Sequence, residues 1–208
     1  MSIKAVVFDY GQVICLPQDP SAIDRLAKLA GVERDKFEPC LWGLRGEYDL
    51  GNINSEEYYK KVLSSIGAED KADEDKIVEE MIEVDLSSWK NINPETVTLM
   101  EDVKKAGYTL GILSNMPQDF LDWARENIAA FSLPHKSLFS CEVNLVKPDK
   151  AIYRKLLSML EIDSCELVFF DDNEENVKSA RDLGIEAFLW KDPENARQEL
   201  FSLGVRLR

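Results

Sequence analysis

The sequence predicts an α/β protein in which a doubly wound parallel sheet carries a small all-helical domain, inserted after the first strand. Two apolar runs, Ala5–Phe8 and Leu167–Phe170, are short and do not alternate with polar residues, which is typical of strands buried on both faces. Strand and helix patterns alternate from residue 94 onward, which favours parallel pairing with right-handed crossovers. Residues 15–90 show no convincing strand pattern, so we expect that segment to be helical.

The first part of the chain holds one predicted strand and the predicted insertion. The strand covers residues 3–9, and Gly11 allows a tight turn after it. Small polar residues followed by acids, as in Asn54–Glu57, are typical of helix starts. The helices expected in the insertion cover residues 20–31, 33–45, 54–67 and 71–88. We therefore expect residues 16–89 to form a helical domain, and residues 1–15 with 90–208 to form the α/β domain.

The rest of the chain repeats the strand and helix pattern. Strands are expected at residues 108–113, 138–141, 167–171 and 187–190. Helices are expected at residues 94–105, 118–129, 149–160 and 174–183. Pro94 and Gly107 flank the first of these helices, in the places that proline and glycine favour at helix ends.

Composition and charge exclude several classes of function. The chain has 208 residues, of which 45% are hydrophobic and 31% charged, as in ordinary globular domains. No apolar stretch approaches the ~20 residues of a membrane helix, and no signal-peptide pattern precedes the first strand. The net charge of −14 argues against nucleic acid and anionic membranes as partners. One histidine and four cysteines without a CxxC pair make a zinc site or disulfide framework unexpected. We expect a cytoplasmic monomer or homodimer that acts on a small molecule.

Acidic and polar side chains stand at or just beyond the ends of several predicted strands. They are Asp9, Ser114, Asn115, Lys147, Asp171 and Asp172. The carboxyl ends of parallel strands form the edge at which open α/β sheets bind ligands. Three carboxylates at one edge repel one another unless a cation lies among them, and oxygen ligands favour Mg²⁺. Lysine, hydroxyl and amide donors beside such an ion form a pocket for phosphate. A carboxylate there can attack phosphorus.

These residues resemble the four motifs of the haloacid dehalogenase-like (HAD) hydrolase superfamily. The matching segments are Phe8–Ile14, Leu113–Asn115, Val146–Asp149 and Phe170–Asn173. Their order and separations match over nearly the whole chain. The helical insertion resembles the small helical cap of that superfamily, and residues 46–58 resemble a stretch common in such caps. The resemblance implies a Rossmann-like core, a Mg²⁺ cofactor and phosphatase activity on a small phosphorylated metabolite.

The resemblance also implies a role for each matched residue. Asp9 would be the nucleophile, and Lys147 would pair with it and with the phosphate. Ser114 and Asn115 would bind phosphate. The metal ligands would be Asp9, the backbone carbonyl of Gly11, Asp171 and Asp172. In the cap, Arg45 either contacts substrate or lies in solvent, whereas Trp42 is expected to belong to the cap core.

One position departs from the usual pattern of the superfamily. Most of its phosphatases carry a second aspartate two residues after the nucleophile, and this chain has Gly11 there. General acid–base help is worth ~10²–10⁴-fold in rate, and glycine cannot give it. A branch of the superfamily with glycine at this position includes sugar-1-phosphate phosphatases, and this chain is similar to them. A phosphate on an anomeric carbon leaves more easily than one on an ordinary alcohol, which lessens the need for an acid. Gln12, a cap residue or a water molecule is left as the candidate for this role.

Three alternatives to a phosphatase remain. Because Gly11 lacks an acid, the chain could be a weak catalyst that binds a phosphorylated ligand or a protein partner. A 2-haloacid dehalogenase is less favoured, because Asp171 and Asp172 would be unpaired charges without a cation. A phosphosugar mutase is also less favoured, because phosphoryl transfer between alcohols needs the missing acid–base group.

Overall fold

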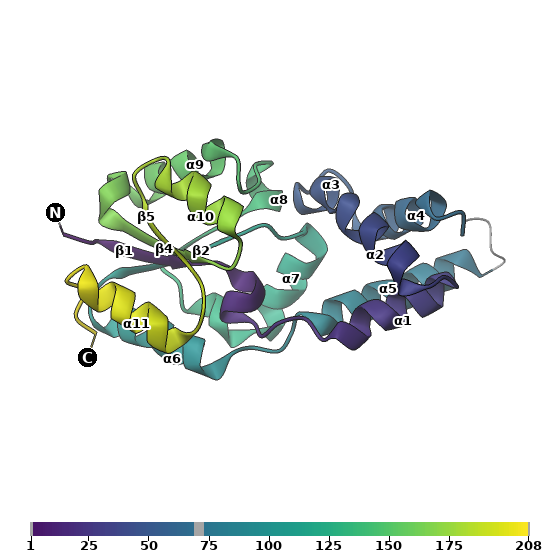
Figure 1. Ribbon diagram of the computed structural model, residues 1–208, viewed down its shortest axis with the longest axis horizontal. Coiled ribbons are helices and arrows are strands. Elements are labelled where there is room, and N and C mark those ends of the chain that lie inside the picture. Colours follow the sequence, from purple (N-terminus) through teal and green to yellow (C-terminus); the bar gives the residue numbers. More distant parts are fainter. Residues whose placement is uncertain (1, 69–72, 208) are drawn as a thin grey trace.

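The computed structural model describes residues 2–68 and 73–207, and it shows a five-stranded parallel sheet next to a helical cap (Figure 1). The strands are β1 (Ala5–Phe8), β2 (Thr109–Ser114), β3 (Lys136–Phe139), β4 (Leu167–Asp171) and β5 (Glu186–Leu189). Their order is β3-β2-β1-β4-β5, so the first strand of the chain lies at the centre of the sheet. The predicted doubly wound α/β fold is confirmed.

Helices cover both faces of this sheet (Figure 1). One face packs against α9 (Lys150–Leu160) and α10 (Glu174–Arg181), and the other against α6 (Pro94–Lys105), α7 (Gln118–Asn127) and α11 (Pro193–Ser202). Val6 and Phe8 of the central strand belong to the core with α6 and α7, whereas Ala5 and Val7 belong to the core with α9 and α10. Successive strand residues point to opposite faces. Burial on both faces therefore explains why the apolar runs do not alternate with polar residues.

The cap lies between β1 and α6 in the chain and has its own hydrophobic core (Figure 1). Its helices are α1 (Pro20–Ala30), α2 (Arg34–Gly43), α3 (Arg45–Asp49), α4 (Ser55–Ser65) and α5 (Glu74–Ser88). The chain leaves the sheet domain and returns to it through adjacent segments, because Cys15 and Ile92 form an antiparallel bridge. The Leu16 backbone N–H donates to the Asn91 carbonyl at 2.7 Å beside that bridge. The described part of the chain has no helix with the length and apolar character needed to cross a membrane.

Several predicted elements differ from the structure. The helix expected at residues 33–45 is two helices, α2 and α3, that meet at Leu44. The third strand was expected to include Ser140, but it ends at Phe139 and the short helix α8 (Ser140–Val143) follows. The Ser140 hydroxyl accepts the Met116 backbone N–H and donates to the Asp49 carbonyl. These contacts join distant parts of the chain, so no local sequence pattern predicts them. Of the helix expected at 71–88, residues 71–72 lie outside the described residues. The helix α11 was not predicted, because its buried stripe is short and its sequence mostly polar.

Gly111 of β2 lies where an added methyl group does not fit. A Cβ atom there would lie 2.8 Å from Val7 Cγ2 and 3.2 Å from the Lys136 carbonyl oxygen. Gly111→Ala should lower the free energy of unfolding in urea by about 1–3 kcal/mol, as overpacking of a dense core does. Gly43→Ala is the matched control, because a Cβ at Gly43 meets no atom of the described residues within 4 Å. Equal stability of the Gly111→Ala variant and the unsubstituted protein would contradict this packing.

Candidate active site

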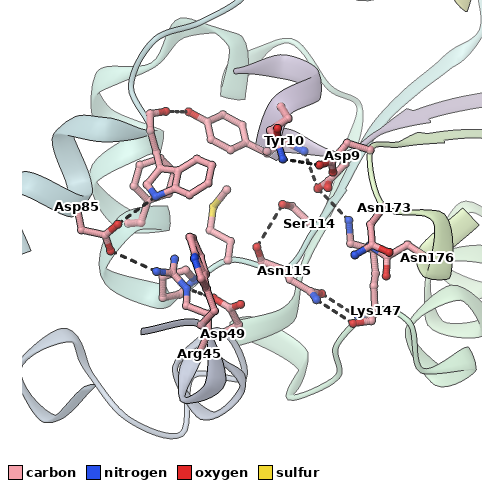
Figure 2. Close-up of a pocket in the computed structure, with 18 of the residues that line it drawn as sticks. Asp9, Tyr10, Arg45, Asp49, Asp85, Ser114, Asn115, Lys147, Asn173 and Asn176 are labelled. Carbon is pink, nitrogen blue, oxygen red and sulfur yellow. Dashed lines mark hydrogen bonds and ion pairs between the residues drawn. The ribbon is translucent and has the colours of Figure 1, made fainter. Parts of the chain in front are cut away.

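The sheet brings two carboxylates together at its carboxyl edge. Phe8 of β1 pairs in register with Phe170 of β4, so Asp9 and Asp171 follow at the same level on neighbouring strands. The Asp9 backbone N–H donates to the Phe170 carbonyl at 2.9 Å. Ser114 ends β2, which pairs with β1 on its other side. Parallel register therefore places these three side chains at one edge, where Figure 2 shows Asp9 and Ser114 beside a cavity.

The backbone makes a wide turn directly after Asp9, over Tyr10–Ile14. The Tyr10 backbone N–H donates to Asp9 Oδ1 at 2.7 Å, which orients the carboxylate. Gln12 has a φ of 56°, and its side-chain amide donates to Asp172 Oδ2 at 2.6 Å. Gly11 has an ordinary φ of −60°, and a Cβ there would meet only the Trp89 ring, at 3.9 Å. The local geometry would therefore accept a Cβ atom at position 11. Glycine is not required there by the backbone, and its presence leaves this position without an acidic side chain.

Lys147 links the carboxylates at the sheet edge. Its Nζ lies 2.9 Å from Asp9 Oδ1 and 2.6 Å from Asp171 Oδ2, and its side chain is 1% exposed. The backbone of Lys147 is held by Asn115, whose Oδ1 accepts the Lys147 N–H at 2.8 Å and whose Nδ2 donates to the Lys147 carbonyl at 2.9 Å. The Asn115 side chain thus positions Lys147. The backbone of Asn115 is then the part of this residue that can face a ligand.

The carboxylates of Asp9, Asp171 and Asp172 form a set of oxygen donors that suits a hard divalent cation. One oxygen from each lies within 4.8 Å of the others. Lys147 contributes one positive charge against three carboxylates, so the cluster carries an excess of negative charge that a divalent ion would neutralise. Burial raises the pKa of Asp9 to about 7, although Lys147 opposes the shift. Burial and the neighbouring Asp171 raise the pKa of Asp172 as well. A bound cation would favour the ionised forms, so these residues fit Mg²⁺.

Cap residues form the opposite wall of the same cavity, which has a volume of about 290 Å³ (Figure 2). Arg45 Nε donates to Asp49 Oδ1 at 3.0 Å, and Arg45 Nη1 donates to Asp85 Oδ2 at 3.3 Å. The guanidinium also lies over the Tyr48 ring, 5.1 Å from its centroid. Arg45 thus lines the cavity and does not lie in open solvent. Trp42 lines the cavity too and is 40% exposed, so the expectation that it belongs to the cap core was wrong.

Comparison with known families identifies the chain. The family model of the haloacid dehalogenase-like hydrolases matches residues 3–184, from β1 through the last of the four motifs. The chain belongs to the haloacid dehalogenase-like hydrolases. The four segments of this HAD hydrolase that resemble the superfamily's motifs all lie within the matched residues.

Curated relatives and solved structures agree with this membership. The HAD hydrolase is 26% identical over 218 residues to D-ribitol-5-phosphate phosphatase of Bacteroides thetaiotaomicron, across 95% of this chain and 97% of that protein. It is 29% identical over 233 residues to bifunctional epoxide hydrolase 2 of Sus scrofa, across 100% of this chain. The chain spans two fifths or less of the length of the epoxide hydrolase relatives it matches. A HAD-family enzyme of Bacteroides thetaiotaomicron, solved with magnesium and inorganic phosphate, has the same fold, with a TM-score of 0.73 at 23% identity over 91% of this chain and 95% of that one.

The structure of this HAD hydrolase also shows polar residues in the cavity that sequence reasoning missed. Asp85 lies on the buried stripe of α5 with Val78 and Met81, and its Oδ1 accepts the Trp89 indole N–H at 3.1 Å. A carboxylate at an apolar position of a helix is a signal that could have found it. Asn176 was missed as well, and its amide donates to Asp171 Oδ1 at 3.0 Å. That contact depends on how α10 packs on β4.

Proposed function

We propose that this HAD hydrolase is a Mg²⁺-dependent phosphatase that hydrolyses a small phosphorylated metabolite through an aspartyl phosphate on Asp9. The observation that carries the proposal is the contact of the Lys147 ammonium with both Asp9 and Asp171, beside Asp172 and at the wall of a cavity. Relatives named as phosphatases, in Mycobacterium tuberculosis and Bacteroides thetaiotaomicron, support it.

Asp9 presents one free oxygen for the attack. Its Oδ1 is engaged by Tyr10 and Lys147, whereas Oδ2 accepts no hydrogen bond from the described residues. Asp9 Oδ2 forms a bond to phosphorus as the bond from phosphorus to the leaving oxygen breaks, and that oxygen departs with the electron pair and takes up a proton. Water then attacks the aspartyl phosphate, which releases phosphate and restores the Asp9 carboxylate.

The neighbouring groups stabilise the charge that moves in these steps. Lys147 neutralises phosphoryl oxygens and Asp9, and the Ser114 hydroxyl and Asn115 backbone N–H donate to the phosphoryl group. When held by Asp9, the Gly11 carbonyl, Asp171 and Asp172, Mg²⁺ would supply a further positive charge against the phosphoryl oxygens.

The cap wall favours a sugar phosphate as the substrate. Arg45, Asp49 and Asp85 offer hydrogen-bonding groups to hydroxyls, and the indoles of Trp42 and Trp89 offer flat apolar faces. The volume of about 290 Å³ admits a small metabolite, near the lower end of ligand pockets in general. The match to a protein named as a ribitol-phosphate phosphatase supports the same class.

A panel of phosphorylated metabolites tests the proposal. We expect phosphate release from sugar phosphates in Mg²⁺ and none when the ion is chelated. Stabilisation of the fold by a compound, without phosphate release from any compound, would favour the alternative of a binding protein. The lack of an acid at Gly11 is the reason for that alternative. Halide release from a 2-haloacid would favour a dehalogenase, and transfer of phosphate between sugar positions would favour a mutase. A monomeric or homodimeric state, a cytoplasmic location and the exclusion of nucleic-acid and membrane partners stay predictions.

Mg²⁺ should stabilise the fold, and more so at higher pH. Because burial raises the pKa of Asp9 to about 7 in the ion-free protein, the folded state binds more protons than the unfolded chain between about pH 4 and 7. Stability without the ion therefore falls as pH rises through that window, whereas Mg²⁺ binds ionised carboxylates. At 100-fold excess over its Kd the ion adds about 2.7 kcal/mol, or a rise in Tm of roughly 5–10 °C.

Thermal unfolding in Mg²⁺ and in chelator measures this effect. The two pH values, roughly 5.5 and 7.5, lie below and above the pKa of Asp9 in the folded protein. Asp172→Asn should reduce the Mg²⁺-dependent rise in Tm, whereas the exposed Asp182→Asn should not. A Tm that does not respond to Mg²⁺ at either pH would contradict the assignment of the metal ligands.

A further inference from the structure

The proposed reaction needs a proton for the leaving oxygen, and Gly11 has no group to give it. Several ionisable side chains line the cavity. They are those of Asp9, Tyr10, Arg45, Asp49, Asp85, Lys147 and Asp172. The proton donor must reach the leaving group on the cap side of the phosphate, away from the sheet edge that holds the phosphoryl group.

Most of these groups are committed elsewhere. Asp9 is the proposed nucleophile, Asp172 a proposed metal ligand, and Lys147 is paired with two carboxylates. Arg45 stays protonated. The Tyr10 hydroxyl donates to the Trp89 carbonyl at 2.6 Å, and burial raises the pKa of that phenol. The two carboxylates of the cap, Asp49 and Asp85, remain.

The hydrogen bonds of these two carboxylates differ. Asp85 uses both oxygens, because Oδ1 accepts from Trp89 and Oδ2 accepts from Arg45. Asp49 uses only Oδ1, which accepts from Arg45, and its Oδ2 accepts no hydrogen bond from the described residues. Asp49 is also largely buried, and burial raises the pKa of its carboxyl, although Arg45 opposes the shift. A raised pKa favours the protonated form that a general acid needs.

Contacts with the sheet domain hold the backbone of Asp49 in place at the wall of the cavity. The Ser140 hydroxyl of α8 donates to the Asp49 carbonyl and also accepts the Met116 backbone N–H, so it joins the cap to the loop after β2. Two residues further on, Gly51 has a φ of +76°, and a Cβ there would lie 2.9 Å from the Cys141 carbonyl oxygen. Only glycine allows this close approach. The position of Asp49 is therefore fixed by the docking of the cap on α8.

We propose that Asp49 is the general acid and base of the reaction, in the place of the aspartate missing at position 11. Asp49 Oδ2 gives its proton to the leaving oxygen as the bond to phosphorus breaks, and it then accepts a proton from the water that attacks the aspartyl phosphate. Asp49 is thereby returned to its protonated form, and protons balance over the cycle. This inference rests on the proposed phosphatase activity.

The dependence of kcat/KM on the leaving group tests the acid step. An alkoxide needs a proton to depart, whereas nitrophenolate departs without one. In Asp49→Asn, kcat/KM for an alkyl phosphate should fall ~10²–10⁴-fold, with a deficit at least tenfold smaller for p-nitrophenyl phosphate. The asparagine Oδ1 can still accept from Arg45, so the cap contact is retained. Asp85→Asn changes the other carboxylate of the cap wall. It can lower kcat/KM for both substrates through binding, but it should leave the ratio between them unchanged.

The base step gives a second signature. Asp49→Asn should show a burst of one equivalent of nitrophenol followed by a slow phase, because the aspartyl phosphate waits for unassisted water. Equal deficits for both substrates, or an altered ratio in Asp85→Asn and none in Asp49→Asn, would overturn the inference while leaving the phosphatase proposal intact. Absence of phosphate release by the unsubstituted protein from every phosphate tested would instead overturn the phosphatase proposal, and the inference with it.

Discussion

Asp9→Asn should reduce phosphate release from an aryl phosphate by a factor on the order of 10⁴–10⁶, the range found when the nucleophile of a covalent mechanism is removed. The amide is a poor nucleophile, and the neighbouring carboxylate of β4 cannot replace Asp9, because hydrogen bonds engage both of its oxygens. This carboxylate, Asp171, accepts hydrogen bonds from Lys147, Asn173 and Asn176. Steady-state release of nitrophenol from p-nitrophenyl phosphate measures the loss.

The fold of the Asp9→Asn variant should remain intact. The asparagine Oδ1 can accept the Tyr10 N–H as Asp9 does, so the turn after β1 keeps its first hydrogen bond. Circular dichroism and size-exclusion chromatography check the fold. Asp24→Asn, which changes an exposed acid of α1, is the matched control and should keep full activity. Activity within tenfold of the unsubstituted protein in a folded Asp9→Asn variant would reject Asp9 as the nucleophile.

Lys147→Met should cost both stability and activity. Its removal leaves the carboxylates of Asp9 and Asp171 without their shared cation, and breaking a buried ion pair in this way costs about 3–5 kcal/mol. Lys147 lowers the pKa of Asp9, so its removal should raise the pKa of that carboxyl further, and the loss of stability in chelator should increase as pH rises. Phosphate release should fall by about 10²–10³-fold or more, as on removal of one group that stabilises transition-state charge.

Two comparisons separate this effect from a general loss of packing. Lys150→Met removes an exposed lysine, paired with the exposed Asp182, and should change neither stability nor activity measurably. Adding Asp9→Asn to Lys147→Met removes one unpaired carboxylate and should restore part of the stability, which urea denaturation in a double-mutant cycle measures. Additive losses in that cycle would contradict the coupling between Lys147 and Asp9.

The sheet edge could be predicted because it depends on local signals. Apolar runs that end at Asp9 and at Asp171 indicate buried strands, and parallel register then places both carboxylates at one edge without further information. The cap wall could not be predicted in the same way. Arg45 meets Asp49 on its own helix, but it meets Asp85 only because α3 packs near the end of α5. Such contacts depend on tertiary packing, which the sequence pattern does not encode.

We propose that the boundaries between the two domains lie near residues 16 and 89. The chain passes from the sheet domain to the cap after β1 and returns before α6. The bridge between Cys15 and Ile92 lies on the sheet side of both connections, and the cap core begins with α1. The Tyr10 hydroxyl, in the turn after β1, donates a hydrogen bond to the Trp89 carbonyl, in the segment that returns from the cap. A change in the relative position of the cap would therefore act on the backbone next to Asp9.

The covalent intermediate on Asp9 is the central claim, and rapid-quench mass spectrometry tests it most directly. Protein mixed with p-nitrophenyl phosphate and Mg²⁺, quenched in acid during turnover and digested, should contain an N-terminal peptide that carries one phosphoryl group on Asp9. The signal should be stronger in Asp49→Asn and absent in Asp9→Asn. Turnover by the unsubstituted protein with no phosphorylated Asp9 at any time, in either the unsubstituted protein or Asp49→Asn, would contradict the account.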